Sequence, residues 1–199
     1  MNIQSISFII ILIFSVVMHE LAHGYAADSL GDPTPRLAGR LTLNPLAHLD
    51  WFGSVILPAF LVISGSPFLV GWAKPVPFNP HYLRNKKWGG ALVALAGPTS
   101  NIVLAIIFAL ILKFAPLSLF MVGFVNSIII TNIALAVFNL VPIPPLDGHH
   151  ILYAVLGNRA SQVKAFLQRY AMVILIIFII YGWKFISPLV MWLYHILVF

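Results

Sequence analysis

The sequence predicts an all-α polytopic membrane protein, because its composition cannot cover a water-facing surface. Of its 199 residues, 61% are hydrophobic and only 8% are charged, with a mean hydropathy of +1.00. A soluble domain carries about 25% charged residues. Several apolar stretches are also long enough to cross a bilayer. We therefore expect a chain embedded in lipid, with no nucleic-acid partner.

The predicted spans follow from length and hydropathy. A transmembrane helix needs about 20 predominantly apolar residues. Four stretches meet this requirement, near 3–27, 89–112, 117–141 and 171–199. The last contains Gly182, Lys184 and Pro188, which leaves open one tilted helix or two pieces. No segment between the spans is long or polar enough for an attached soluble domain, so 1–199 is expected to form one domain.

A fifth apolar stretch, 51–70, is interrupted by Gly53, Pro58, Gly65 and Pro67. Irregular backbone is tolerated at membrane depth only where it is buried in protein or lines a cavity. We therefore expect a re-entrant or hairpin insertion here rather than a span.

One motif in the first span has the spacing of a metal site. His19, Glu20 and His23 form the pattern H-E-x-x-H, and side chains at i and i+4 lie on one helix face. Both imidazoles can then reach one zinc ion, and the intervening glutamate can take a proton from water. The alternative is a polar helix-packing network. Ionisable groups are costly within a membrane, which favours the metal site.

A catalytic zinc site usually has three protein ligands, so a third is needed. Asp147 is the best candidate, because it ends a proline-rich run directly after a strong span. Asp28 is a weaker choice, since it lies about 140° from His23 around a continuing helix. Four histidines stay open as alternatives: His48, His81, His149 and His150.

Three motifs together resemble the site-2 protease family of intramembrane zinc metalloproteases. They are H-E-x-x-H, the run Gly97-Pro98-Thr99-Ser100-Asn101, and the run from Asn139 to Gly148. The runs 43–48 and 71–76 further resemble a compact prokaryotic branch of this family that lacks PDZ and CBS domains.

The resemblance implies one Zn²⁺ ion held by His19, His23 and Asp147, with Glu20 as the catalytic base. It also implies that the substrates are transmembrane proteins in a lipid bilayer, cleaved in or near their helices during regulated intramembrane proteolysis. A membrane metal-binding or metal-transport protein is the alternative from another class, and an inactive family member is a further one.

A shared zinc ion would also determine the direction of the helices. The first span and the 117–141 span must end on the same membrane side, with 89–112 running oppositely between them. Segment 51–70 then makes an even number of crossings, most simply none. Basic residues are concentrated in 71–88 and in the loop expected at 149–170, whereas turn 113–116 has only Lys113. We therefore expect a multi-pass cell-membrane protein whose zinc site faces the cytoplasm.

Two asparagines and one loop are secondary candidates. Asn139 and Asn101 are possible contacts to the substrate or to an oxyanion. The alternative for Asn139 is a helix-packing hydrogen bond, and the alternative for Asn101 is the close helix approach that Gly97 allows. The proline-rich segment 71–80 offers an extended edge that can pair with an unwound substrate. The alternative for this segment is an ordinary surface loop.

Overall fold

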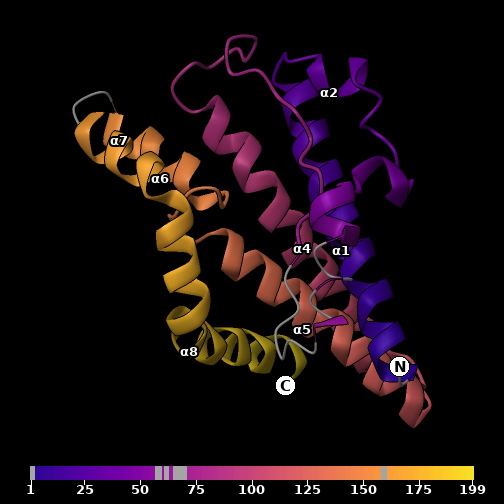
Figure 1. Ribbon diagram of the computed structural model, residues 1–199. Helices are drawn as coiled ribbons and strands as arrows, with labels where there is room; N and C mark the ends of the chain where they lie inside the picture. Colours follow the sequence, from indigo (N-terminus) through magenta and orange to yellow (C-terminus); the bar gives the residue numbers. More distant parts are fainter. Residues whose placement is uncertain (1–2, 57–59, 61–62, 65–70, 158–160) are drawn as a thin grey trace.

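The computed structural model describes residues 3–56, 60, 63–64, 71–157 and 161–199, which form a bundle of helices (Figure 1). Four of these helices are long and apolar enough to cross a membrane. They are α1 (Ile3–Ser29), α4 (Gly89–Phe114), α5 (Leu119–Asn139) and α8 (Ala171–Val198). The described residues contain no β-strand. The prediction of an all-α polytopic membrane protein is confirmed.

The ends of these helices have local causes. Helix α4 stops at Phe114, two residues before Pro116, and the Ser118 hydroxyl caps α5 by accepting the Met121 N–H at 3.4 Å. Pro188 lies inside α8 without ending it, although the helix changes direction along its length (Figure 1). Residues 171–198 are therefore one helix, which resolves the question that the sequence left open.

Helix α4 packs between α1 and α5 and runs opposite to both. The N–H of Arg84, just before α4, donates to the Leu30 carbonyl just after α1 at 3.0 Å, so the start of α4 lies beside the end of α1. The short turn 115–118 then returns the chain antiparallel along α5. Ala105 and Ala109 of α4 are buried against Ile129 and Ile133 of α5, because small residues allow close helix approach.

The two ends of segment 51–70 lie side by side. The Lys74 N–H donates to the His48 carbonyl at 2.8 Å, and the Trp72 N–H donates to the Gly53 carbonyl at 3.2 Å. The segment begins with the π-helical turn η2 (Trp51–Ile56). Residues 72–74, just after the segment, lie beside the residues where it starts. Most of residues 57–70 lie outside the described part of the chain, so the re-entrant path stays a prediction.

The expectation of a loop over 149–170 is wrong. This region forms two short helices, α6 (Gly148–Leu156) and α7 (Ser161–Arg169). Each helix is only nine residues long, so a search for spans of about 20 apolar residues does not detect it. Two short elements also follow α1, the turn α2 (Thr34–Leu37) and the 3₁₀ turn η1 (Pro45–His48).

Candidate metal centre

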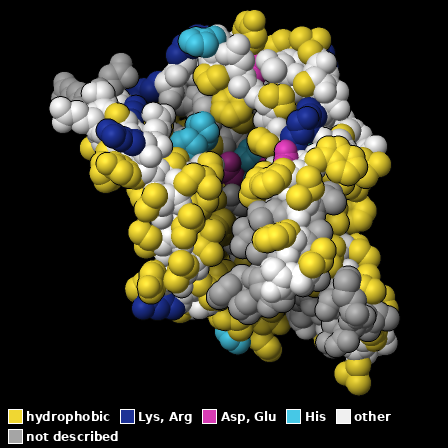
Figure 2. Space-filling view, viewed as in Figure 1, with side chains coloured by type: hydrophobic (Ala, Val, Ile, Leu, Met, Phe, Trp, Pro, Cys, Tyr) yellow, Lys and Arg dark blue, Asp and Glu magenta, His cyan; other side chains and the backbone are white. Residues whose placement is uncertain are grey.

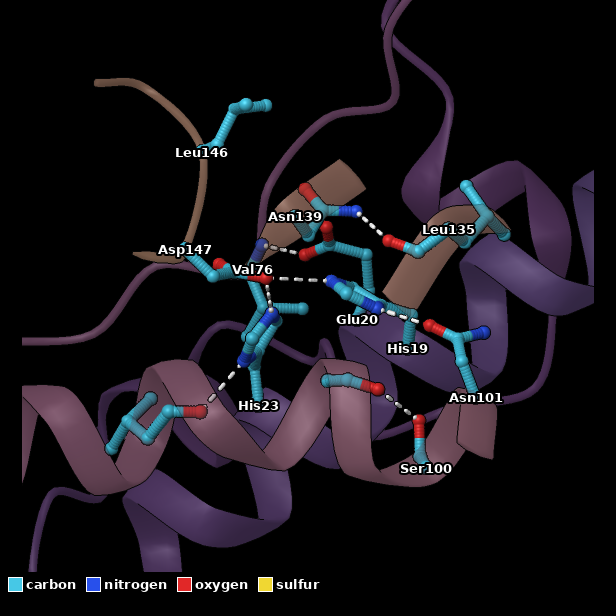
Figure 3. Close-up of polar contacts among 12 residues, drawn as sticks. His19, Glu20, His23, Val76, Ser100, Asn101, Leu135, Asn139, Leu146 and Asp147 are labelled. Atoms are coloured by element: carbon cyan, nitrogen blue, oxygen red, sulfur yellow. Dashed lines mark hydrogen bonds and ion pairs between the residues drawn. The ribbon is translucent and has the colours of Figure 1, made fainter. Parts of the chain in front are cut away.

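Three side chains of the types that bind metal ions converge where α1 meets the loop after α5 (Figure 3). His19 and His23 lie one turn apart on α1, with ring centroids 4.6 Å apart. Asp147 Oδ2 is 3.0 Å from His19 Nε2 and 3.3 Å from His23 Nε2. One ligand atom from each residue lies within 4.8 Å of the other two. In the space-filling view, acidic and histidine side chains gather in a hollow near the middle of the molecule (Figure 2).

A tight backbone turn carries Asp147 to the histidines. A Cβ on Gly148 would lie 2.2 Å from the Leu140 carbonyl oxygen, so only glycine allows this approach. Asp147 precedes α6, yet its side chain does not cap that helix and stays available for the histidines. Its Oδ2 faces the Nε2 atoms of both rings.

The outer nitrogens of both imidazoles are hydrogen-bonded to carbonyl oxygens. His19 Nδ1 lies 2.5 Å from Asn101 Oδ1, and His23 Nδ1 lies 2.7 Å from the Val93 backbone oxygen. A carbonyl oxygen can only accept, so each Nδ1 must carry the proton. In the neutral ring each Nε2 then presents a lone pair toward Asp147. This is the tautomer in which histidine binds a metal.

The donor set fits a zinc ion. Two imidazole lone pairs and a carboxylate oxygen repel one another unless a cation lies among them. Ligands about 2.0–2.1 Å from a tetrahedral zinc ion lie about 3.3 Å from one another, close to the 3.0 and 3.3 Å observed. Gly97 of α4 supplies the necessary space, because a Cβ there would lie 2.4 Å from His23 Nε2 and 2.6 Å from His19 Nε2.

Glu20 lies beside this group without joining it. Its Oε2 accepts the backbone N–H of Val76 at 2.8 Å (Figure 3). Val76 belongs to the proline-rich segment 71–80, which is extended. Ala73 of this segment forms an isolated antiparallel bridge with Leu49. One interpretation of the sequence was that this segment pairs with the substrate. In the structure the segment lies beside the carboxylate of Glu20.

The other candidate ligands make contacts of their own. Asp28 pairs with Arg36 at 3.3 Å, and Asp32 and Asp50 accept backbone N–H groups. Among the alternative histidines, His48 contacts the Thr42 carbonyl, His149 contacts the Leu146 carbonyl, and His81 is exposed. His150 packs edge-on against Phe78. Within the described residues, the group of His19, His23 and Asp147 does not include any of them.

The two asparagines differ in their surroundings. Asn101 is fully buried, and its amide contacts His19, Ser15 and Asn132. Asn139 is half-buried at the end of α5, where its Nδ2 donates to the Leu135 carbonyl at 3.0 Å. Sequence reasoning missed Ser15 and Asn132. A polar residue inside an otherwise apolar span was the signal that could have identified them.

Comparison with known proteins adds an independent finding. The chain matches the model of peptidase family M50 over residues 7–122 and 115–182. It is 38% identical over 192 residues to YwhC of Bacillus subtilis, covering 91% of this chain and 80% of YwhC. Rip2 of Mycobacterium tuberculosis is 30% identical over 188 residues, covering 92% and 70%. MJ0611 of Methanocaldococcus jannaschii is 34% identical over 157 residues, covering 76% and 73%. All three are named as zinc metalloproteases, and no solved structure matches the chain.

Proposed function

The chain belongs to peptidase family M50 and is a membrane-embedded zinc metalloprotease, and from this premise we propose that it cleaves other membrane proteins in or near their transmembrane helices. The observation that carries the proposal is the position of the site. His19, Glu20 and His23 all lie inside the apolar helix Ile6–Ser29. A peptide bond must therefore come to membrane depth to be cut.

In this proposal His19, His23 and Asp147 hold the zinc ion. A bound zinc ion supplies Lewis acidity, which lowers the pKa of water and polarises a carbonyl oxygen. The two imidazoles are already oriented for this ion, because Asn101 Oδ1 and the Val93 carbonyl accept the Nδ1 protons. The ionised Asp147 adds the negative charge that favours a divalent cation.

Glu20 acts as the general base. Of the five acids in the chain, Asp147 faces the histidines and three others are bonded to Arg36 or to backbone N–H groups elsewhere. Glu20 is the remaining carboxylate beside the site, and the Val76 N–H engages its Oε2. Its other oxygen can take a proton from water and return it to the leaving amine.

The proposal extends to the substrate backbone. A helical substrate hides its carbonyls in hydrogen bonds, so it must unwind before attack. Segment 71–80 offers an extended edge beside Glu20, where the unwound chain can pair. An amide group has two N–H donors, and the contact of Asn139 with Leu135 uses one of them. The second can reach a substrate carbonyl.

The experiment that tests this function compares membranes containing the wild type with membranes containing Glu20→Gln. The substitution keeps the shape of the side chain and removes the base. Zinc content should stay at wild-type level, and helical fragments of membrane proteins should appear only with the wild type. Full cleavage by the Glu20→Gln variant would overturn the assignment of Glu20. Zinc binding by the wild type with no released fragments would overturn the proposed substrate class.

A further inference from the structure

A buried set of polar side chains from three helices lies beside His19. Ser15 lies one turn before His19 on α1, Asn101 lies on α4, and Asn132 lies on α5. All three are buried. Polar groups at this depth must find partners within the protein, so each donor and acceptor of these side chains is expected to form a hydrogen bond with another residue.

The hydrogen bonds form a connected chain across three helices. Asn101 Nδ2 donates to the Ser15 carbonyl at 3.3 Å and to Asn132 Oδ1 at 2.8 Å. Asn132 Nδ2 donates in turn to Ser15 Oγ at 3.0 Å and to the Ile128 carbonyl at 2.9 Å. Every amide nitrogen and oxygen of the two asparagines is therefore used.

Two backbone carbonyls determine which atom donates and which accepts in this series of hydrogen bonds. The Ser15 and Ile128 carbonyls can only accept, so the Nδ2 group of each asparagine must face them. Asn101 Oδ1 is then turned toward His19 Nδ1, and a flipped amide would place N–H against N–H. His23 differs, because the backbone of Val93 orients it directly.

We infer that Asn132 and Ser15 are positioning residues for zinc binding, which act on His19 through Asn101. The inference rests on the ligand set proposed above. Asn132 holds the Asn101 amide in the orientation that keeps the proton on His19 Nδ1, so that Nε2 is free for the metal. It also ties this orientation to α5, the helix that leads to Asp147.

Metal affinity of the purified full-length protein is the direct test. Zinc-free protein is titrated with Zn²⁺ against a chelator, and the visible spectrum of the Co²⁺-loaded form reports the coordination. Loss of an outer partner of a metal ligand costs about 10–100-fold in affinity. Asn101→Leu should fall in this range, Asn132→Leu should weaken binding about tenfold, and Ser15→Ala should weaken it less. If Asn132→Leu does not fold, Asn132→Ser takes its place.

Asn126 provides a matched control on the same helix. It accepts the Tyr194 hydroxyl of α8 at 2.7 Å and contacts none of these residues. Asn126→Leu should lower thermal stability and leave zinc affinity within about twofold of the wild type. Wild-type affinity and an unchanged Co²⁺ spectrum in the Asn132 variants, with weakened binding in Asn101→Leu, would overturn the inference. Wild-type affinity in His19→Ala would instead contradict the proposed ligand set.

Discussion

The backbone N–H of Val76 donates to Oε2 of Glu20 at 2.8 Å across 56 residues of sequence. The segment that carries Val76 is held in place further along the chain. The Asn79 N–H donates to Asp32 at 2.5 Å, and the Arg84 N–H donates to the Leu30 carbonyl at 3.0 Å. The carboxylate of Glu20 is therefore oriented by main chain that is itself anchored to the end of α1.

Substitution of Val76 by proline should slow catalysis without removing zinc. Proline deletes the N–H that Glu20 accepts, and Pro77 already restricts residue 76 to extended conformations that proline can adopt. A hydrogen bond to a charged group contributes about 1.5–3 kcal/mol, so kcat should fall by about tenfold or more. Turnover of a substrate found in the Glu20→Gln comparison, together with zinc content, checks this prediction.

The matched control for this prediction is Val76→Ala, which keeps the N–H and shortens the side chain. Its kcat should stay near that of the wild type, whereas its stability should fall, because Val76 is buried. Equal kcat values for the proline and alanine variants would show that the N–H does not contribute to catalysis.

Substitution of Gly97 by alanine should abolish tight zinc binding. The added Cβ would lie 2.4 Å from His23 Nε2 and 2.6 Å from His19 Nε2, which forces the rings apart. Gly123→Ala on α5 is the control, because a Cβ there meets nothing within 4 Å, and alanine favours a helix by about 0.5–1 kcal/mol. Zinc titration and thermal denaturation of both variants check the prediction. Wild-type zinc affinity in Gly97→Ala would contradict the geometry described for the site.

The features that the sequence predicted are those with a local pattern. Continuous hydropathy identified α1, α4, α5 and α8, and the i, i+4 spacing identified His19 and His23 before any contact was known. Asp147 could be chosen because it closes a proline-rich run just after a span. The structure places it 3.0 Å from His19, although the two residues lie 128 positions apart.

The features that the sequence did not predict depend on tertiary contacts. Nothing in the local pattern shows that Val93 offers its carbonyl to His23, or that Val76 offers its N–H to Glu20, because backbone groups carry no sequence signal. For Asn101 the sequence left open a substrate contact or close helix packing beside Gly97, and it did not indicate that this residue is buried against His19. Helices α6 and α7 were missed because each is nine residues long, which is too short to be detected when only membrane spans are sought.

Substitution of Asp32 by asparagine should destabilise the protein. Asp32 is fully buried, with Oδ1 accepting the Thr34 N–H and Oδ2 accepting the Asn79 N–H. Asparagine has only one carbonyl oxygen, so one of these N–H groups would face an amide N–H. The cost of about 2–3 kcal/mol should lower the unfolding temperature by about 5 °C or more.

Asp28→Asn is the control for Asp32, because the two residues flank the same turn. Asp28 pairs with Arg36, whose side chain is 66% exposed, and exposed ion pairs contribute little. Thermal denaturation of the two variants in one detergent gives the comparison. Equal unfolding temperatures would show that the buried hydrogen bonds of Asp32 do not hold the loop in place.

The distribution of basic residues predicts the orientation of the protein in the membrane. Lys74, Arg84, Lys86 and Lys87 lie on the side where α1 ends and α4 begins, whereas the turn between α4 and α5 is preceded by Lys113 alone. Positive charge is retained on the cytoplasmic side, so residues 115–118 should lie outside the cell. A reporter that is active only outside the cell should therefore be active when it is fused after Pro116. Activity of a reporter that works only in the cytoplasm would show that the orientation is the opposite one.

The full-length chain allows the same prediction to be tested without truncation, because it contains no cysteine. Leu119→Cys, at a side chain that is 93% exposed, should react with a membrane-impermeant maleimide in intact cells. Gln162→Cys on α7, which is also exposed, should react only after the cells are permeabilised. The reverse labelling pattern would place the zinc site toward the outside, and substrates would then have to be cut from that face of the membrane.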